Sequence, residues 1–165
     1  MDPFSFRGIN AVSFGIDRVE KLAGDIDQLD RKATKVFVIS DVGVAKAGIT
    51  DRIRGVLVRS GYHVTVFSEL DGEPHTAAAD KAAKLLRQLS HAVVVGVGGG
   101  SVLDVAKFAA VIAADETPAE DYALCARPLP KSRIKRIMIP TTSGTGSEVT
   151  RTAVFTTSKG NKVWA

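Results

Sequence analysis

The chain has 165 residues, 45% of them hydrophobic and 24% charged, and a formal net charge of +4 at pH 7. This length suits one α/β domain with a core of its own, and the composition excludes disorder and collagen-like repeats. No apolar run reaches the roughly 20 residues that a membrane span needs, and the mild positive charge would slightly favour an anionic ligand without implying nucleic acid.

The first third of the chain predicts short strands, a helix, a buried strand and a second helix. An apolar stretch within residues 4–15 predicts one or two short strands. Asp17 then precedes apolar residues at helical spacing, so we expect it to cap a helix. Residues 35–40, Lys-Val-Phe-Val-Ile-Ser, form a run rich in β-branched residues, which is typical of a strand buried on both faces. A helix should follow, from residue 43 or 49 to residue 60.

The middle of the chain alternates strands with helices. Residues 63–67 predict a strand, which an acidic loop follows over residues 69–74. Residues 76–89 are rich in alanine and predict a helix. Residues 92–97 then predict a strand without a polar residue, which runs into glycines and a helix from about residue 102 to residue 113.

The last third of the chain adds an irregular segment and one core strand. Residues 117–132 contain prolines and precede a strand at residues 136–140, and Val154 and Phe155 suggest one more short strand. Strands that alternate with helices imply right-handed βαβ units, so we predict a Rossmann-like α/β fold, an open and mostly parallel sheet with helices on both faces. Ligands bind such sheets beyond the carboxyl ends of the strands, where the strand order switches.

The stretch from Gly96 to Ser101, Gly-Val-Gly-Gly-Gly-Ser, is the strongest candidate for a ligand site. Glycines at a helix N-terminus let an anion approach the main-chain N–H groups, and Ser101 could cap this helix with Asp104 as its capping-box partner. Serine replaces the third glycine of the dinucleotide fingerprint, and no acidic residue follows on a second strand. A tight turn is the alternative, but three consecutive glycines exceed what a turn needs, so we favour phosphate binding.

Two other features lie at the carboxyl ends of predicted strands. Asp41 could accept hydrogen bonds from an adenosine ribose and repel a 2′-phosphate, which would favour NAD over NADP. An N-cap for the next helix is an equally good interpretation. Residues 141–147, Thr-Thr-Ser-Gly-Thr-Gly-Ser, place five hydroxyl groups after a strand. These donors suit a phosphate, a ribose or a nicotinamide carboxamide better than they suit a solvated linker.

The remaining polar residues show no pattern that predicts chemistry. A basic cluster around residues 127–136 lacks the interleaved aromatic residues that nucleic-acid binding would need. His63, His75 and His91 lack metal-ligand spacing. Cys125 is the single cysteine and cannot form an internal disulfide, and the N-terminus lacks the features of a signal peptide, so we expect a cytoplasmic protein.

Together the two glycine motifs resemble the iron-containing (group III) alcohol dehydrogenase family. The resemblance rests on residues 98–107, Gly-Gly-Gly-Ser-Val-Leu-Asp-Val-Ala-Lys, and on residues 139–150, Ile-Pro-Thr-Thr-Ser-Gly-Thr-Gly-Ser-Glu-Val-Thr. Phe14-Gly15 and Ser40-Asp41 also lie where the family has them. The resemblance covers essentially the whole chain. It implies an N-terminal nucleotide-binding domain of the dehydroquinate synthase-like kind and a C-terminal helical domain that carries the metal.

The same resemblance implies cofactor roles for named residues. Asp41 would hold the adenosine ribose and select NAD over NADP. Asp104 would lie on the nicotinamide side of the site. The residues that would bind the pyrophosphate are Gly98, Gly99, Gly100 and Ser101. The other positions that would contact the cofactor are Thr141, Thr142, Thr145, Val154 and Lys162.

The resemblance also implies what this chain lacks. The family binds iron or zinc through one aspartate and three histidines in the half that would follow Ala165. We therefore expect residues 1–165 to be the cofactor-binding half of an NAD-dependent alcohol dehydrogenase, inactive alone and without catalytic or metal-binding residues. A related glycerol dehydrogenase or dehydroquinate synthase-like enzyme is the alternative, as is a non-catalytic nucleotide-binding module. The missing half would leave apolar surface exposed, which could lead to a homo-oligomer.

Overall fold

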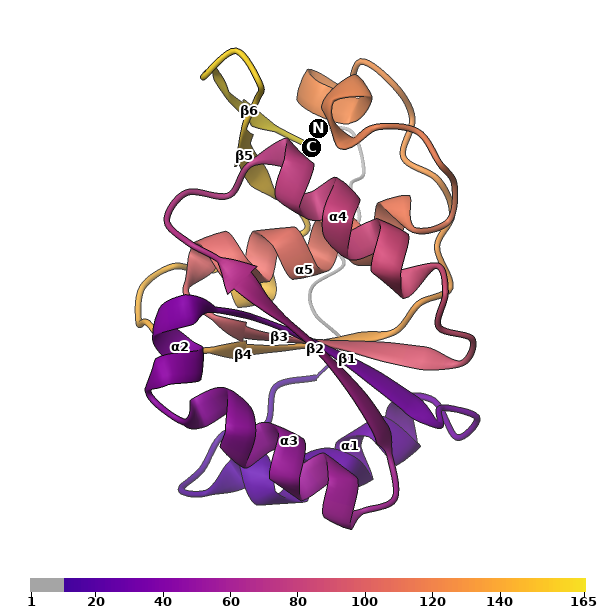
Figure 1. Cartoon of the computed structure of the whole chain (residues 1–165), viewed down its shortest axis with the longest axis vertical. Helices are drawn as coiled ribbons and strands as arrows, with labels where there is room; N and C mark the ends of the chain where they lie inside the picture. Colours follow the sequence, from indigo (N-terminus) through magenta and orange to yellow (C-terminus); the bar gives the residue numbers. More distant parts are fainter. Residues whose placement is uncertain (1–10) are drawn as a thin grey trace, which may run out of the picture.

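A parallel sheet lies between two layers of helices in the computed structural model, which describes residues 11–165 (Figure 1). The strands are β1 (Lys35–Asp41), β2 (His63–Leu70), β3 (Ala92–Gly98), β4 (Arg136–Pro140), β5 (Val154–Thr156) and β6 (Lys162–Trp164). The α-helices are α1 (Leu22–Leu29), α2 (Val42–Lys46), α3 (Ile49–Arg59), α4 (Thr76–Leu86) and α5 (Gly100–Ile112). The 3₁₀ turns are η1 (Arg18–Lys21), η2 (Ala119–Cys125) and η3 (Ser147–Val149).

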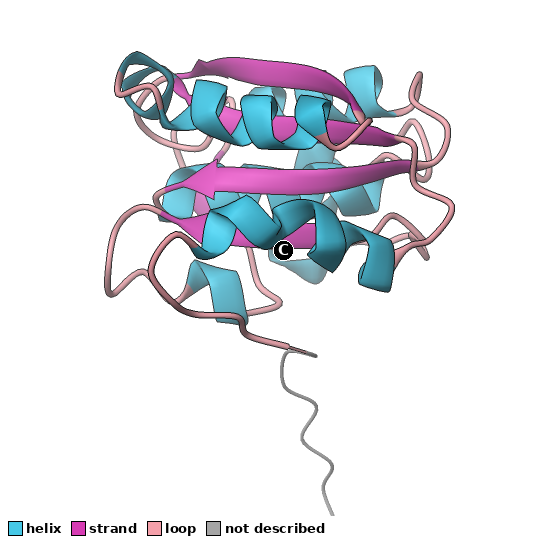
Figure 2. Cartoon of the chain, turned by 90° about the horizontal axis from the view of Figure 1, so that it is seen from below, coloured by secondary structure: helices cyan, strands magenta, loops and turns pink. Residues whose placement is uncertain are grey.

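The main sheet has four parallel strands in the order β2-β1-β3-β4. Figure 2 shows strands side by side across the molecule, with helices in front of and behind them. The strand order changes direction between β1 and β3, because the chain adds β2 on one side of β1 and β3 on the other. The predicted Rossmann-like class is therefore confirmed, and the switch in strand order falls at β1 and β3.

The core has two halves, one on each face of the sheet. On one face α4 and α5 pack against Phe37 and Ile39 of β1, and on the other α1 and α3 pack against Val36 and Val38. Side chains alternate between the faces of a strand, so a strand covered on both faces needs apolar residues at every position. This requirement explains the continuous apolar runs of β1 and β3. None of the helices in residues 11–165 is long and apolar enough to cross a membrane.

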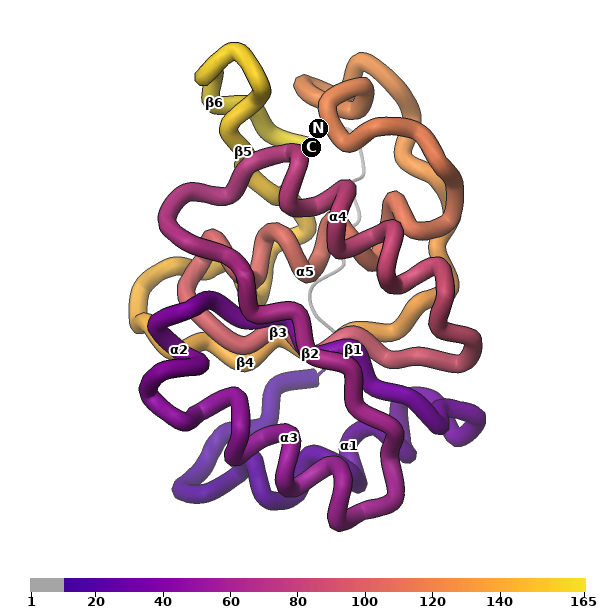
Figure 3. The backbone as a smooth tube through the Cα atoms, in the orientation of Figure 1, coloured from indigo at the N-terminus to yellow at the C-terminus, as the bar shows by residue number. Residues whose placement is uncertain are grey.

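The last residues form a separate antiparallel hairpin, β5–β6. It lies beside the segment that leads into α4, where Thr156 forms a bridge with His75 (Figure 3). The backbone N–H of Thr156 donates to the carbonyl of Pro74 at 2.8 Å. The strand predicted at Val154 and Phe155 is confirmed. Its partner β6 is too short to show an alternating pattern, and so it was not predicted.

Two expectations for the start of the chain are wrong. Residues 11–14 form no strand, and the side chains of Phe14 and Ile16 are 99% and 98% exposed, so no neighbour in residues 11–165 covers them. Residues 4–10 of that predicted stretch lie outside the described residues. Asp17 precedes the 3₁₀ turn η1 and caps no helix. Its carboxylate instead forms an ion pair with Arg52 at 2.7 Å.

The helices that follow β1 and β3 also differ from the prediction. Gly48, with a φ of 76°, separates α2 from α3 where one helix was an option. Helix α5 begins at Gly100 with Gly99 as its N-cap, and no side chain caps it. The predicted cap at Ser101 and the capping-box role of Asp104 are therefore wrong. The helix starts about one residue after the strand ends, so Ser101 already lies in its first turn.

Candidate functional site

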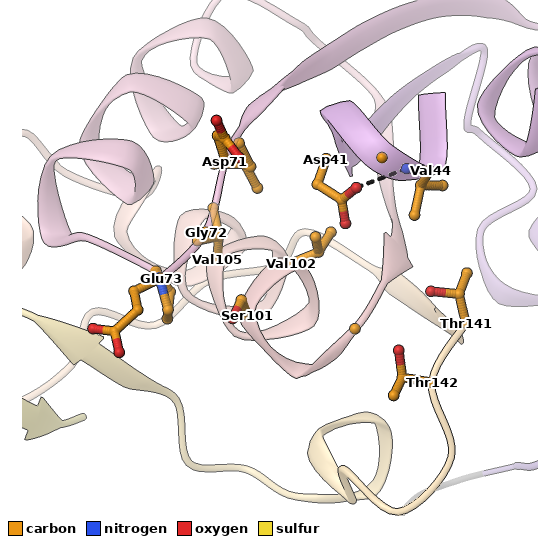
Figure 4. Close-up of a pocket in the computed structure, with 14 residues that line it drawn as sticks. Asp41, Val44, Asp71, Gly72, Glu73, Ser101, Val102, Val105, Thr141 and Thr142 are labelled. Carbon is orange, nitrogen blue, oxygen red and sulfur yellow. Dashed lines mark hydrogen bonds between the residues drawn. The ribbon is translucent and has the colours of Figure 1, made fainter. Parts of the chain in front are cut away.

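A cleft of about 470 Å³ lies at the carboxyl edge of the sheet, across the ends of β1 and β3. This position is the switch in strand order, where sheets of this class bind their ligands. In Figure 4, Asp71 and Glu73 lie on one side of the cleft, Thr141 and Thr142 on the other, and α5 between them. The residues that line it are Asp41, Gly43, Val44, Leu70, Asp71, Gly72, Glu73, Pro74, Gly99, Ser101, Val102, Val105, Thr141 and Thr142.

Two roles were predicted for Asp41, an N-cap and a ribose contact. The structure shows the N-cap and places the side chain in the cleft. Its Oδ1 accepts a hydrogen bond from the backbone N–H of Val44 at 2.7 Å, so it is the N-cap of α2 (Figure 4). The same side chain lines the cleft. A Cβ on Gly43 would lie only 3.1 Å from Oδ1, so this glycine leaves room for the carboxylate. The cap fixes the orientation of Asp41 through Oδ1, and no hydrogen bond engages Oδ2 within residues 11–165.

The glycines between β3 and α5 divide into two groups. A Cβ on Gly96 would lie 2.7 Å from Cβ of Ala106, and one on Gly98 would lie 2.6 Å from Cγ2 of Val102. These two glycines therefore allow the strand and the helix to pack closely. Gly99 instead lines the cleft, and its Cβ would meet only Thr142, with Oγ1 at 3.4 Å. The first turn of a helix carries the positive end of its dipole, so this end of the cleft favours an anion.

The threonine loop, residues 141–147, forms the wall opposite the acidic residues. The N–H of Thr141 donates to the carbonyl of Gly98 at 2.9 Å, which extends the pairing of β4 with β3 into the loop. Thr141 and Thr142 consequently line the cleft beside Gly99. Thr145 lies outside the lining and donates through its hydroxyl to Glu148 at 3.0 Å. Its Cβ would lie 3.4 Å from a Cβ on Gly100, so the loop packs directly on the start of α5.

The acidic loop after β2, for which no role was predicted, forms a wall of the cleft. Glu73 is held there by the hairpin: Oε1 lies 3.0 Å from Nζ of Lys162, and Oε2 accepts from the Thr156 hydroxyl at 2.9 Å. Its hydrogen bonds to Lys162 and Thr156 lower the pKa of Glu73 below its ordinary value of 4.5. Ligands bind such sheets at the edge formed by the carboxyl ends of the strands, which we call the edge rule. The acidic loop follows β2 at this edge, so the rule that selected Asp41 would have identified the loop as well.

The predicted site residues are thus only partly gathered in the cleft. Those that line it are Asp41, Gly99, Ser101, Thr141 and Thr142. Those that lie outside its lining are Gly98, Gly100, Asp104, Thr145, Val154 and Lys162. The N–H of Val154 donates to Oδ2 of Asp104 at 3.0 Å, and this residue of α5 is buried. Among residues 11–165, no three His, Cys, Asp or Glu side chains lie together as a metal site requires.

The sheet order and the cleft at its switch point define a Rossmann-like α/β domain of the kind that binds nucleotides. A family model described as iron-containing alcohol dehydrogenase matches residues 10–165. The chain therefore belongs to the iron-containing alcohol dehydrogenase family.

Similar proteins are longer than this chain. It is 38% identical over 143 residues to long-chain-alcohol dehydrogenase 1 of Geobacillus thermodenitrificans, a match that covers 86% of this chain and 36% of the relative. It is 32% identical to the long-chain primary alcohol dehydrogenase AdhA of Thermoanaerobacter ethanolicus, across 96% of this chain and 40% of the relative.

A solved structure with the same fold contains a nicotinamide cofactor. The sulfoacetaldehyde reductase of Bifidobacterium kashiwanohense, crystallised in complex with NAD+, superimposes with a TM-score of 0.85 at 29% identity. The match covers 99% of this chain and 43% of that protein. The chain thus spans about two fifths of the length of the relatives that it matches.

Proposed function

We propose that this chain is the cofactor-binding part of an NAD-dependent, metal-dependent alcohol dehydrogenase, which transfers a hydride between an alcohol or aldehyde and the nicotinamide. The cleft across β1 and β3 carries the proposal, because Asp41 and the start of α5 line it together. A dinucleotide needs an acceptor for its ribose hydroxyls and donors for its phosphates. The names of the relatives and the NAD+ complex of the reductase support the same assignment.

The acidic side of the cleft supports NAD rather than NADP as the cofactor. Oδ2 of Asp41 would accept a hydrogen bond from an adenosine ribose hydroxyl, while Oδ1 stays on the N–H of Val44. A 2′-phosphate would meet this carboxylate in a cleft that Asp71 and Glu73 also line. Like charges repel most strongly where little water separates them, so NADP should bind more weakly.

The other side of the cleft suits the pyrophosphate. Gly99 leaves space that a side chain would fill, and the first turn of α5 offers N–H groups and the positive end of the helix dipole. The hydroxyls of Thr141 and Thr142 add neutral donors. When bound, NAD supplies the nicotinamide that accepts the hydride. Cofactor contacts of Gly98, Gly100, Asp104, Thr145, Val154 and Lys162 stay predictions.

The rest of the activity belongs to a longer protein in this proposal. The chain spans about two fifths of its relatives, which supports a further, helical domain that binds the metal, either iron or zinc. Exposed apolar side chains such as Val149 and Trp164 support self-association of the shorter chain. The single cysteine, Cys125, supports a reducing cytoplasm.

Isothermal titration calorimetry of the chain with NAD and with NADP tests the proposal. We expect saturable binding of NAD and at least about tenfold weaker binding of NADP, because one unfavourable charge contact of about 1.4 kcal/mol has that effect. AMP serves as a control for the adenosine end alone. No saturable binding of either dinucleotide would overturn the proposed function, and a preference for NADP would overturn the role of the acidic side.

A further inference from the structure

A buried ion pair in α5 lies outside the lining of the cleft. The side chains of Asp104 and Lys107 are 12% and 7% exposed, and Nζ of Lys107 lies 2.9 Å from Oδ1 of Asp104. The Asp104 carboxylate also accepts hydrogen bonds from the Ser147 hydroxyl and, at 3.0 Å, from the N–H of Val154. The Asp104 side chain thus binds Ser147 and Val154, two residues of the segment that follows β4.

Lys107 holds the same segment from the next turn of the helix. Its ammonium group donates to the carbonyl of Thr152 at 2.6 Å and to the hydroxyl of Thr150 at 3.2 Å. With the bond to Asp104, all three ammonium protons have an acceptor. The two charged side chains therefore join residues 147–154 to α5 as one hydrogen-bonded network.

Stability alone does not explain this network. Removing two charges from water is costly, and well-packed apolar residues in place of a buried ion pair often stabilise a protein. Directional hydrogen bonds do what apolar contacts cannot, because they fix particular backbone atoms at particular places. The network fixes the N–H of Val154 and the carbonyl of Thr152, and both lie in the segment that follows the threonine loop.

The threonine loop depends on anchors at both of its ends. The bond from Thr141 to Gly98 fixes its beginning, and the bond from Ser147 to Asp104 fixes its end. Between them, Gly144 and Gly146 have φ values of 87° and 66°. Glycine loses more conformational freedom on ordering than any other residue, so this loop would be mobile with one end free.

We infer that Asp104 and Lys107 are positioning residues, which hold the threonine loop on α5 so that Thr141 and Thr142 face the glycine turn before a ligand arrives. Donors that are already in place spare the ligand the entropic cost of ordering them. The identity of the ligand, NAD, rests on the proposed function. The ordering of the loop does not, and it can be measured without any cofactor.

The variant Lys107→Met tests the inference, since it keeps an unbranched apolar stem of similar length and removes the three donors. Hydrogen exchange should become at least about tenfold faster for backbone amides within residues 143–152, because a loop amide exchanges through local opening. At a temperature where the variant is folded, its dissociation constant for NAD should also rise about tenfold, the effect of losing about one charge-assisted hydrogen bond. Ser147→Ala, which removes a single hydroxyl, should show the same changes more weakly.

Lys35→Met is the matched control. Lys35 lies at the amino end of β1, where its ammonium is 3.5 Å from the hydroxyl of Ser90, away from the cleft. This control should leave both the exchange and the NAD affinity unchanged. If Lys107→Met does not fold, Ser147→Ala decides in its place.

The outcomes separate the inference from the proposed function. Unchanged exchange within residues 143–152 overturns the inference, whether or not the chain binds NAD. Faster exchange with an unchanged NAD affinity also overturns it, because the order of the loop would then not serve the cleft. If the unsubstituted chain does not bind NAD, the proposed function fails, and the exchange result alone decides whether the network positions the loop.

Discussion

Asp41 shows how one side chain can serve the fold and a ligand at once. Its Oδ1 caps α2 through the N–H of Val44, while the carboxylate lines the cleft. Any variant that removes the whole side chain would change both features. An amide keeps the cap, because asparagine and aspartate are equally good N-caps, but it removes the charge. Asparagine therefore separates the two roles.

We predict that Asp41→Asn narrows the preference for NAD over NADP without lowering the melting temperature. The charge that would repel a 2′-phosphate is gone, and the cap to Val44 remains. Asp41→Gly should narrow the preference as well and cost a few tenths of a kcal/mol through the lost cap. Calorimetric dissociation constants for both dinucleotides check this. An unchanged ratio in both variants would remove Asp41 from the ribose site.

The glycines between β3 and α5 have different roles, and substitutions should distinguish these roles. Gly99→Val should abolish NAD binding and leave thermal unfolding nearly unchanged, because Gly99 has an ordinary φ of −74° and a Cβ there would meet only Thr142, which lines the cleft with it. Retained affinity in calorimetry would contradict the phosphate-site assignment.

Gly96→Ala, in contrast, should lower the stability of the fold. Its Cβ would lie 2.7 Å from Cβ of Ala106 in a closely packed core, so we expect a loss of about 1–3 kcal/mol. In a chain of this length, each kcal/mol lowers the melting temperature by about 2–4 °C. A scanning calorimeter measures the change. An unchanged melting temperature would show that α5 can move away from β3.

At the scale of elements, the β5–β6 hairpin acts as a support for the acidic loop. Glu73 joins them through Lys162 and Thr156, and the N–H of Thr156 donates to Pro74. The open end of the hairpin is also closed by hydrogen bonds, since the backbones of Ala153 and Ala165 exchange two bonds of 2.9 and 3.0 Å. The wall of the cleft that Glu73 forms therefore depends on residues more than 80 positions away, as the bond to Thr156 spans 83.

We predict that this contact weakens in acid. The folded state lowers the pKa of Glu73, chiefly through Lys162, so its contribution is complete above the ordinary value of 4.5 and is lost as the pH falls through the lower, folded value. In an NMR titration, the chemical shift of the Thr156 amide should change as Glu73 becomes protonated below pH 4.5. Glu73→Gln should remove that step. A Thr156 amide that titrates equally in the variant would contradict the contact.

At the scale of the whole molecule, the sheet places one polar residue or loop at the end of each strand. Asp41, the acidic loop, the glycine turn and the threonine loop follow β1, β2, β3 and β4, and all contribute to one cleft. Parallel strands produce this gathering, because their carboxyl ends share an edge. The cleft is the proposed cofactor site, whereas the described residues supply no group of three metal-ligating side chains.

We therefore predict that the chain binds NAD but does not oxidise small alcohols, even with added iron(II). Residues 11–165 group no three metal-ligating side chains, so we expect no metal to polarise the reacting oxygen, an effect of several kcal/mol in metal-dependent reactions. The absorbance of NADH checks the prediction, with a longer family member as the positive control. NADH formation at an ordinary enzymatic rate, about 1–1000 per second, would contradict it.

The sequence predicted the parts of the fold that depend on local pattern. The apolar runs of β1 and β3 indicate strands buried on both faces, and glycines after a strand indicate a close approach to a helix. The edge rule then placed Asp41, Gly99 and Thr141 together without any tertiary information, and all three line the cleft. Each of these features depends on residues within a few positions of it in the chain, so the local sequence predicts it.

Only the tertiary structure decided the contacts between distant segments. It buried Asp104 beside Ser147 and Val154, 43 and 50 positions away, so a predicted capping partner became a member of an ion-pair network. It also brought the hairpin to Glu73 and made the acidic loop a wall of the cleft. The physical reason is that residue spacing records which face of an element is apolar, whereas the partner of a polar group depends on how the chain closes long loops around the core.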